Sequence, residues 1–473
     1  MERLIKIGKI KPRKASEIKN SRIGIGFEKL DRKVFNPEKA YDKLAMIGAK
    51  WVRIQSGWER TEQEKGVYDF EWLDSIVDNL LERGLVPWIN LAYGNGLYDD
   101  DAAKVFGAVG CPPVKSEEAK KGWADYITAL AAHMKGRISY YEVWNEPDGE
   151  WCWKHGPNGK EYGQFVVDTS VALKKGDSSA KVIGGAICMA KPLDFAYDAF
   201  SVGMGEHIDA ISFHEYVIDE TVVFRHVKAL RGLCNRFNPN IEIIQGESGS
   251  QSRSDGRGAM RKGAWTPHKQ AKQLLRHLMA DLMTEVKFTS YFSCMDMIEA
   301  LNGTVGDLVS YLDYGYFGVL GADFDAQGRS VGNYTPKPSY YALQTISAIF
   351  SEDVQKADLP IIRWPEVSDR LFGFDCDDPS IVEGGFKCEN GSAAFVYWNS
   401  TNLMTTEFES TVTFYTAGLP DKIRLVDLMD GTVYELPESI LESKGEGKYA
   451  IHNIPIKDYP MALLFGDFKE INI

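Results

Sequence analysis

Eight short apolar runs alternate with longer segments of helical periodicity between about residues 22 and 350. The runs are rich in Val, Ile and aromatic residues, as strands of a parallel sheet buried on both faces are. We expect strands at 23–27, 51–55, 86–91, 139–144, 182–186, 210–214, 241–246 and 289–294. We expect helices at 37–47, 70–83, 117–134, 161–175, 222–236, 267–285 and 337–350. Eight strands, most of them followed by a helix, predict an α/β fold of the TIM (β/α)8 barrel type over residues 21–352, with functional residues at the carboxyl ends of the strands.

The pattern changes after Phe350. Short alternating strands at 393–398, 411–415, 423–427 and 462–465 are separated by turns such as Asn390-Gly391 and Asp430-Gly431, with little helical signal. A chain of 473 residues is also longer than one hydrophobic core usually serves. We therefore expect a small C-terminal antiparallel β-sandwich as an accessory domain over residues 353–473, to which residues 1–20 could add a strand.

Charge and composition exclude several classes of function. The formal net charge of −13 would repel phosphate backbones, so nucleic acid is not expected as a partner. No apolar run approaches the roughly 18 residues that a membrane span needs. The basic N-terminus is not followed by the apolar core of a secretory signal, and the seven cysteines lack disulfide or metal spacing. We expect a cytoplasmic protein, although a trimmed signal would leave the same sequence, and we expect no metal and no cofactor.

Two glutamates end strands that lie far apart in the sequence. Glu146 stands in the run Tyr-Glu-Val-Trp-Asn-Glu-Pro at the end of the fourth strand, and Glu247 stands in Gln-Gly-Glu-Ser-Gly at the end of the seventh. In a closed barrel these strands are nearly opposite, so both carboxyl groups would face the same rim. A structural role, such as a strand-end cap for Glu247, is the alternative interpretation.

Paired carboxyl groups at this rim suit the hydrolysis of a glycosidic bond. With retention of configuration, one carboxylic acid protonates the leaving oxygen while a carboxylate roughly 5 to 5.5 Å away attacks the anomeric carbon. We predict Glu146 as acid/base, held protonated by burial and a neighbouring negative charge, and Glu247 as the ionised nucleophile. Arg53, at the end of the second strand, is the candidate cation beside Glu247, and Asn145 can bind the sugar 2-hydroxyl.

These motifs resemble clan A of the glycoside hydrolases, the retaining TIM-barrel glycosidases. The resemblance covers roughly residues 22–350 and rests on Trp-Asn-Glu-Pro after the fourth strand, Glu247 and Arg53. Phe27-Glu28, the run Ser-Phe-His-Glu-Tyr at 212–216 and the trailing β-sandwich are most similar to family 39, which includes β-xylosidases and α-L-iduronidases. The resemblance implies that His214 and Tyr216 line the sugar site, with the tyrosine hydroxyl beside the nucleophile, and that the protein could form homo-oligomers.

The chain departs from the clan at the eighth strand, where many members have a tryptophan and this sequence reads Tyr-Phe-Ser-Cys-Met-Asp. We expect Asp296 to contact sugar hydroxyls there instead. Aromatic rings on the loops after the strands could stack on sugars, with polar neighbours as anchors. The candidates that we single out for substrate binding are Glu28, Trp58, Asn95 and Trp151.

The sequence thus predicts a retaining glycoside hydrolase, exo-acting and β-xylosidase-like, whose partner is an oligosaccharide or glycoside. An endo-acting polysaccharide hydrolase of the same clan is the alternative within the enzyme class. A carbohydrate-binding pseudoenzyme that has kept the barrel and lost catalysis is the alternative from another class. Barrels host many specificities through their loops, so the sequence indicates the reaction better than the sugar.

Overall fold

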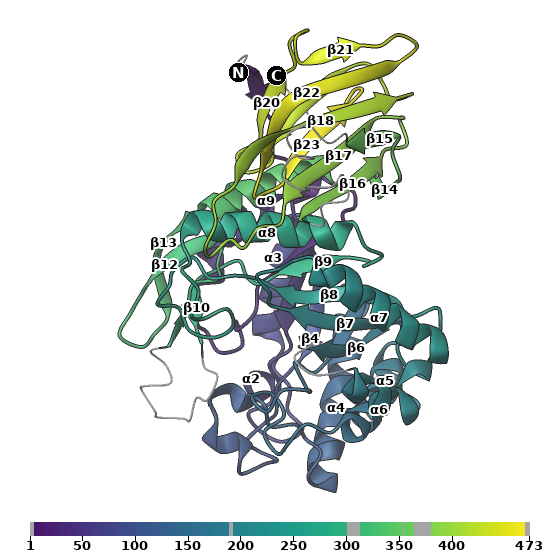
Figure 1. The fold of residues 1–473 in the computed structure, drawn as a ribbon. Coiled ribbons are helices and arrows are strands. Elements are labelled where there is room, and N and C mark those ends of the chain that lie inside the picture. The colour runs from purple at the N-terminus through teal and green to yellow at the C-terminus, as the bar shows by residue number, and fades with distance from the viewer. Residues whose placement is uncertain (1–3, 189–192, 300–312, 353, 364–379, 469–473) are drawn as a thin grey trace.

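A computed structural model describes residues 4–188, 193–299, 313–352, 354–363 and 380–468 (Figure 1). Eight parallel strands close a barrel in sequence order, which confirms the predicted TIM barrel. These strands are β2 (Ile23–Gly26), β3 (Trp51–Gln55), β4 (Val86–Leu91), β5 (Tyr140–Val143), β6 (Lys181–Ile187), β7 (Ala210–Glu215), β8 (Glu242–Ser248) and β9 (Thr289–Tyr291). All eight pair with their neighbours in parallel register, and β9 closes the ring against β2.

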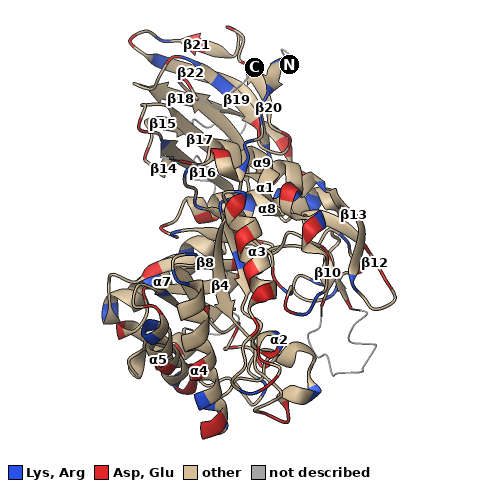
Figure 2. Ribbon diagram, turned by 180° about the vertical axis from the view of Figure 1, so that it is seen from behind, with Lys and Arg blue, Asp and Glu red and all other residues tan. Residues whose placement is uncertain are grey.

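Helices surround this barrel. They are α1 (Tyr41–Ile47), α2 (Trp58–Thr61), α3 (Glu71–Glu82), α4 (Glu117–Met134), α5 (Gly159–Gly176), α6 (Asp194–Ser201), α7 (Val222–Phe237), α8 (Pro267–Leu282) and α9 (Pro338–Ile349). Several begin at a side-chain cap: Ser116 accepts a hydrogen bond from the Ala119 amide, and Thr266 accepts one from the Lys269 amide. Figure 2 shows charged residues on the outward faces of α3 and α4, whereas β4 in the barrel carries none.

An aromatic layer fills the barrel at the amino ends of its strands. The rings of Trp51 and Phe288 stack with centroids 4.4 Å apart, and Tyr140 meets both rings edge-on. Trp88 packs against Phe288 from inside and is fully buried. This layer closes the barrel at the amino ends of its strands. An open site can therefore form only at the opposite rim, where the strands end.

The barrel region contains helices and strands that the sequence did not predict. Helix α6 is only eight residues long, and its apolar pattern is too short to show a clear period. After β9 the chain forms the antiparallel pairs β10 (Met297–Ile298) with β11 (Tyr314–Gly315) and β12 (Leu320–Phe324) with β13 (Ser330–Pro336) before α9 begins. β10 and β11 have only two residues each, and β12 and β13 are largely polar or glycine-containing, so an alternation of apolar and polar residues did not predict them.

The C-terminal part consists of two antiparallel sheets. One sheet has the order β1-β20-β19-β23-β17-β16-β14 and the other β15-β18-β22-β21. Their bounds are β1 (Ile5–Lys9), β14 (Gln355–Lys356), β15 (Ile361–Arg363), β16 (Ile381–Lys387), β17 (Ala393–Asn399), β18 (Glu409–Ala417), β19 (Ile423–Asp427), β20 (Thr432–Glu435), β21 (Leu441–Ser443), β22 (Lys448–Lys457) and β23 (Met461–Phe465). The N-terminal strand β1 pairs with β20, so the first residues of the chain join this part. The ring of Phe414 packs against Phe395 and Tyr397 between the sheets.

Helix α8 connects the barrel to these sheets. In Figure 1 the sheets lie beside α8 and α9. The Arg276 guanidinium of α8 forms a buried ion pair with Glu220 in the loop after β7 and donates to the Thr401 carbonyl. Trp398 of β17 donates its indole N–H to the same Glu220 carboxylate, 2.7 Å away. Helix α8, the loop after β7 and strand β17 therefore all contact the buried Glu220 carboxylate.

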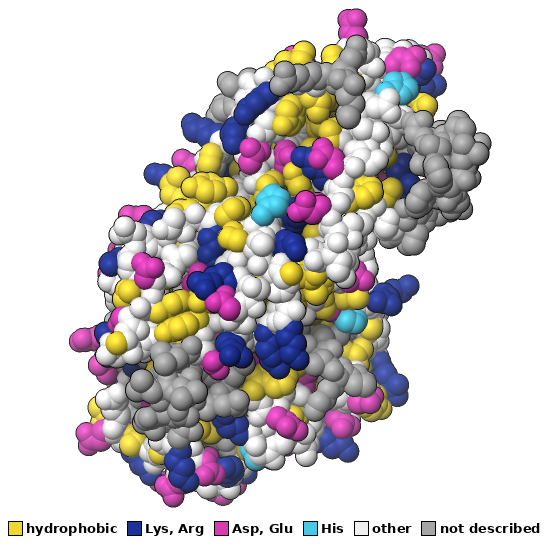
Figure 3. Space-filling model, turned by 60° about the vertical axis from the view of Figure 1, so that its left-hand side comes forward, with side chains coloured by type: hydrophobic (Ala, Val, Ile, Leu, Met, Phe, Trp, Pro, Cys, Tyr) yellow, Lys and Arg dark blue, Asp and Glu magenta, His cyan; other side chains and the backbone are white. Residues whose placement is uncertain are grey.

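The outer surface mixes both signs of charge. On the face drawn in Figure 3, Lys and Arg side chains are interspersed with Asp and Glu among small hydrophobic areas. Such mixing differs from the basic stripe that nucleic-acid-binding proteins carry. None of the helices that the structure describes combines the length and apolar character needed to cross a bilayer.

The junction at Glu220 predicts a large effect on stability. Arg276→Met leaves the buried carboxylate without its cation, so we expect the free energy of unfolding to fall by about 3–5 kcal/mol. Lys121→Met is the matched control, because Lys121 pairs with Asp125 on the exposed face of α4 and its loss should change little. Denaturant unfolding followed by circular dichroism measures both variants. Equal stability of the two would contradict the assignment, and adding Glu220→Gln to Arg276→Met should recover part of the loss.

Candidate active site

Charged side chains from four strands converge at the carboxyl rim of the barrel. Arg53 lies in β3, Glu142 in β5, His214 in β7 and Glu247 in β8, while Glu146 follows the end of β5. The backbone at Glu146 has φ of 43°, in the left-handed region that non-glycine residues seldom adopt. This turn directs the Glu146 carboxylate back over the barrel mouth.

The two predicted glutamates come together at this rim. A carboxylate oxygen of Glu146, one of Glu247 and a ring nitrogen of His214 all lie within 4.8 Å of one another. The glutamate side chains are 13% and 12% exposed, so each is sheltered by protein yet reachable from solvent. This separation fits the gap of about 5 to 5.5 Å in retaining glycosidases rather than the gap of about 6.5 to 9.5 Å in inverting ones.

Arg53 holds the centre of the site. Its fully buried guanidinium donates from Nη1 to Glu247 at 2.7 Å and from Nε to Glu142 at 2.9 Å. It also donates from Nη2 to the Asn145 side-chain oxygen at 2.9 Å. One cation thus fixes the predicted nucleophile, a second carboxylate and the predicted 2-hydroxyl ligand in a single arrangement.

Glu142 is a site residue that we did not single out from the sequence. Its Oε2 accepts from Arg53 and from the Asn90 amide, and its Oε1 accepts from the Ser212 hydroxyl. All of these partners are buried, so Glu142 is the permanent counter-ion of Arg53 rather than a group that reaches the solvent. The Glu-Val-Trp-Asn-Glu pattern contains it, but only the register of β5 shows that it points inward.

Glu247 is fixed by three contacts. Besides the Arg53 bond, the Tyr216 hydroxyl donates to Oε1, and the Glu247 amide donates to the Gln245 side chain. Burial and the Glu247 charge raise the pKa of Tyr216 well above its usual range, so this hydroxyl remains a donor. The contact between Tyr216 and Glu247 is the one that the resemblance implies.

The Glu146 carboxyl group has two nitrogen partners. His214 Nδ1 lies 3.2 Å from Oε1, and the Trp151 indole N–H donates to Oε2. Burial raises the pKa of Glu146, but His214, Trp151 and Arg53 outweigh burial and hold the pKa below its ordinary value. Our expectation that burial keeps Glu146 protonated is therefore wrong, because these three neighbours favour the carboxylate.

Glu28 and Asn145 complete the side of the site around Arg53. The Asn145 amide nitrogen lies 3.4 Å from the Cys152 sulfur, which orients the side-chain oxygen toward Arg53. Glu28 Oε1 is 3.5 Å from Arg53, and its other oxygen is buried without a hydrogen-bond partner. Burial raises the pKa of Glu28 to about 8 despite Arg53, and the Glu247 charge adds to the increase. Burial thus favours the protonated form of Glu28.

Three predicted binding residues do not reach this site. Trp58 is fully buried, stacks on Tyr98 and Tyr126 and donates its N–H to Glu62, so the prediction that it stacks on sugar is wrong. Asn95 is also wrong, because its amide donates to the Glu62 carbonyl inside the loop after β4.

Asp296 is the third correction. It is 3% exposed, pairs with Lys337 at 2.6 Å and accepts the Gly318 amide at 2.9 Å. The chain turns after β9 and directs this carboxylate into the packing of the β12–β13 hairpin against α9. A side chain at the end of a short strand was predicted to face the rim, but the loop reverses its direction.

The site also contains a pair that the sequence did not indicate. Lys29 donates to Glu299 at 2.9 Å and lies over the ring of Phe292. The Glu299 pKa is raised by burial, against Lys29, and the Glu247 charge also raises it. Glu299 follows β10 with no motif around it, so the sequence did not indicate its pairing with Lys29.

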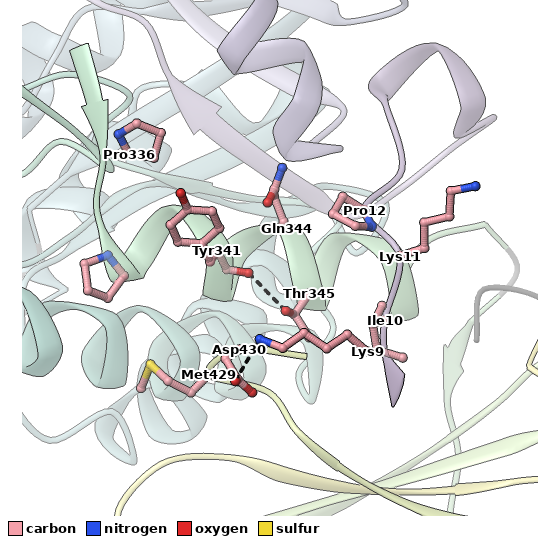
Figure 4. A pocket seen from close by; sticks show the side chains of 11 residues that line it. Lys9, Ile10, Lys11, Pro12, Pro336, Tyr341, Gln344, Thr345, Met429 and Asp430 are labelled. Atoms are coloured by element: carbon pink, nitrogen blue, oxygen red, sulfur yellow. Dashed lines mark hydrogen bonds and ion pairs between the residues drawn. The ribbon is translucent and has the colours of Figure 1, made fainter. Parts of the chain in front are cut away.

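A separate cavity of about 820 Å³ lies elsewhere on the molecule (Figure 4). It is formed by the N-terminal segment, α9 and the turn between β19 and β20, with the ring of Tyr341 and the Lys9–Asp430 ion pair at its surface. None of the rim residues described above lines it, so the cavity and the acidic rim are different places.

Glu28 gives this site a measurable pH dependence. Between about pH 4.5 and pH 8 the folded protein keeps a proton on Glu28 that the unfolded chain has lost, so stability falls as the pH rises through this window. Glu28→Gln keeps the shape and removes the titration. We expect the wild type to lose stability relative to Glu28→Gln from pH 5 to 8 in denaturant unfolding. A difference that stays constant with pH would show that Glu28 is ionised throughout.

Part of the chain is similar in sequence to known glycoside hydrolases. The sequence model described as "Glycosyl hydrolases family 39" matches residues 38–231. A β-xylosidase of Caldicellulosiruptor saccharolyticus is 30% identical over 191 residues, which are 37% of this chain and 38% of that protein. The matched part is thus less than two fifths of the length of the curated relatives.

Solved structures share the fold over nearly the whole chain. A family 39 glycoside hydrolase from Bacteroides cellulosilyticus WH2 superposes with a TM-score of 0.65 at 17% identity, covering 94% of this chain and 81% of the other. A monomeric β-xylosidase from Caulobacter crescentus CB15 gives a TM-score of 0.60 at 17% identity, covering 96% and 97%. Residues 38–231 are thus similar to glycosyl hydrolase family 39, and nearly the whole chain shares the fold of these solved structures.

Proposed function

We propose that this protein is a retaining glycoside hydrolase that works by double displacement. The observation that supports this most strongly is the approach of Glu146 and Glu247 to within 4.8 Å at the open rim of the barrel. A sugar oxygen and an anomeric carbon fit between two carboxyl groups at this spacing. A binding protein without catalysis has no need of two facing carboxylates held by a buried cation.

In the proposed first step, the Glu247 carboxylate attacks the anomeric carbon, and Glu146 gives a proton to the departing oxygen. The bond from Arg53 holds Glu247 in place, and the Tyr216 hydroxyl directs its other oxygen. In the second step Glu146 takes a proton from water, the oxygen of which attacks the same carbon and releases Glu247. Configuration is retained because the carbon is inverted twice.

For the substrate we propose the non-reducing end of an oligosaccharide or a simple glycoside, with β-xylosides as the first candidates. The support is the similarity to proteins called β-xylosidases in the matched segment. Asn145 would bind the 2-hydroxyl, and the neutral acid Glu28 could donate to a neighbouring hydroxyl. A panel of nitrophenyl pentosides, hexosides and uronides tests the sugar, and product lengths from a defined oligosaccharide separate exo-action from endo-action.

The roles of the two glutamates predict opposite products in azide rescue. Glu247→Ala should lose activity by several orders of magnitude, and azide should restore release of a glycosyl azide of inverted configuration. Glu146→Ala, the matched variant, should retain activity on dinitrophenyl glycosides and give a glycosyl azide of retained configuration. Proton NMR determines the anomeric configuration of both products. Retained configuration from Glu247→Ala would overturn the assignment.

Substitutions of Trp151 and Trp58, both predicted from the sequence to stack on sugar, should have different effects on activity and stability. Trp151→Phe removes the N–H donor to Glu146, so we expect kcat/KM to fall about tenfold, the equivalent of one hydrogen bond, with stability nearly unchanged. Trp58→Phe should instead lower the stability by about 2 kcal/mol, since it removes buried volume and the bond to Glu62, and leave kcat/KM unchanged. Steady-state kinetics and thermal unfolding on both variants make the comparison. A raised KM in Trp58→Phe at normal stability would contradict it.

A further inference from the structure

One proton lies between Glu146 and His214, and hydrogen-bond chemistry fixes where it can be. The Trp151 indole N–H can only donate, so Glu146 Oε2 acts as an acceptor and carries no proton toward that partner. Oε1 faces His214 Nδ1 at 3.2 Å. The proton on this line belongs either to Oε1, with a neutral imidazole, or to Nδ1, with a carboxylate.

The surrounding charges decide between these two states. The groups that face His214 are Arg53, Glu142, Glu146 and Glu247, joined by the Tyr216 hydroxyl on Glu247. His214 Nδ1 lies 3.7 Å from Glu247, and Nε2 lies 4.0 Å from Glu142. Arg53 is the one permanent cation in this group, and with all three carboxylates ionised the group would carry a net charge of −2.

A second cation on His214 therefore compensates a buried excess of negative charge. Its ring is fully buried, with a Glu146 oxygen 3.2 Å from Nδ1 and a Glu142 oxygen 4.0 Å from Nε2, which has no hydrogen-bond partner. Burial lowers the pKa of His214, but Glu247 and Glu146 more than offset burial and Arg53, and they raise the pKa above its ordinary value. The opposite shift of Glu146, below its ordinary pKa, agrees with a proton that resides on the imidazole.

We propose that His214 stores the proton that Glu146 delivers. In the free enzyme the proton is on His214 Nδ1, and on substrate binding the Nδ1–H bond breaks as an O–H bond forms at Glu146 Oε1. His214 becomes neutral, and the same proton then passes to the leaving oxygen. His214 acts through Glu146 and is a positioning residue for the proton. The inference rests on the proposed function of Glu146.

Substrate binding should favour transfer of the proton from His214 to Glu146. A bound sugar excludes water from the rim, and an ion pair is less favoured relative to a neutral pair when solvation is withdrawn. Attack by Glu247 then converts its carboxylate into an ester, which removes one of the charges that stabilise the imidazolium. In the second step Glu146 takes a proton from water, Glu247 regains its charge, and the proton returns to Nδ1.

Leaving-group dependence tests the proposal. His214→Asn keeps a side chain that can donate to Glu146 but holds no transferable proton. With phenyl glycosides, which need acid catalysis, kcat/KM should fall by about 10²-fold, within the range that general acids contribute. With dinitrophenyl glycosides, which leave without a proton, the loss should be at least about tenfold smaller. Equal losses with both substrates would mean a structural role and would overturn the proposal.

A second measurement does not depend on turnover. Nitrogen NMR of protein labelled at its eight histidines, with His214→Asn to assign the signal, should show His214 as an imidazolium at pH 7 in the free protein. In Glu146→Gln the signal should become neutral at a lower pH than in the wild type, because one carboxylate is gone. A neutral His214 at pH 7 in the wild type overturns the proposal. If the wild type hydrolyses no glycoside while His214 is an imidazolium, the proposed function fails and the proton location stands.

Discussion

The buried guanidinium of Arg53 is the interaction on which the site depends. It projects from β3 into the barrel, with the Trp88 ring 5.6 Å below it, and it has no access to solvent. A charge in that position is tolerated only because Glu142 and Glu247 compensate it and Asn145 accepts a further bond. The aromatic layer excludes water on the side of the barrel core, and the carboxylates contact the cation on the side of the rim. The packing of the core and the geometry of the site therefore both depend on the position of Arg53.

The glutamates around Arg53 differ in their surroundings. Glu142 is enclosed by donors, Glu28 is buried with one unpartnered oxygen, and Glu146 and Glu247 reach the rim. Similar side chains thus acquire different protonation behaviour from their neighbours alone, as expected when carboxyl groups in one site must perform different tasks. The charge of the group as a whole, rather than any single pKa, decides where its mobile proton is held.

The sequence predicted the barrel because each strand is an apolar run buried on both faces, and β3 and β4 have the predicted bounds. It predicted that Glu146 and Glu247 meet, since residues that follow parallel strands share one rim. It could not predict the direction of side chains on loops. Trp58 turns into an aromatic cluster and Asp296 into a hairpin, whereas Glu299, without any motif, pairs with Lys29. Loop paths depend on packing between distant segments, which no local pattern records.

The contact at Glu220 links the C-terminal sheets to the chemistry. The loop that carries Tyr216 is held by α8 at two points: Gln273 donates to the Val217 carbonyl, and Arg276 pairs with Glu220. Trp398 of the sheet completes the second point. The β-sandwich therefore supports the loop at the barrel mouth that carries Tyr216. A chain trimmed to its barrel alone would lose this support behind the hydroxyl that donates to Glu247.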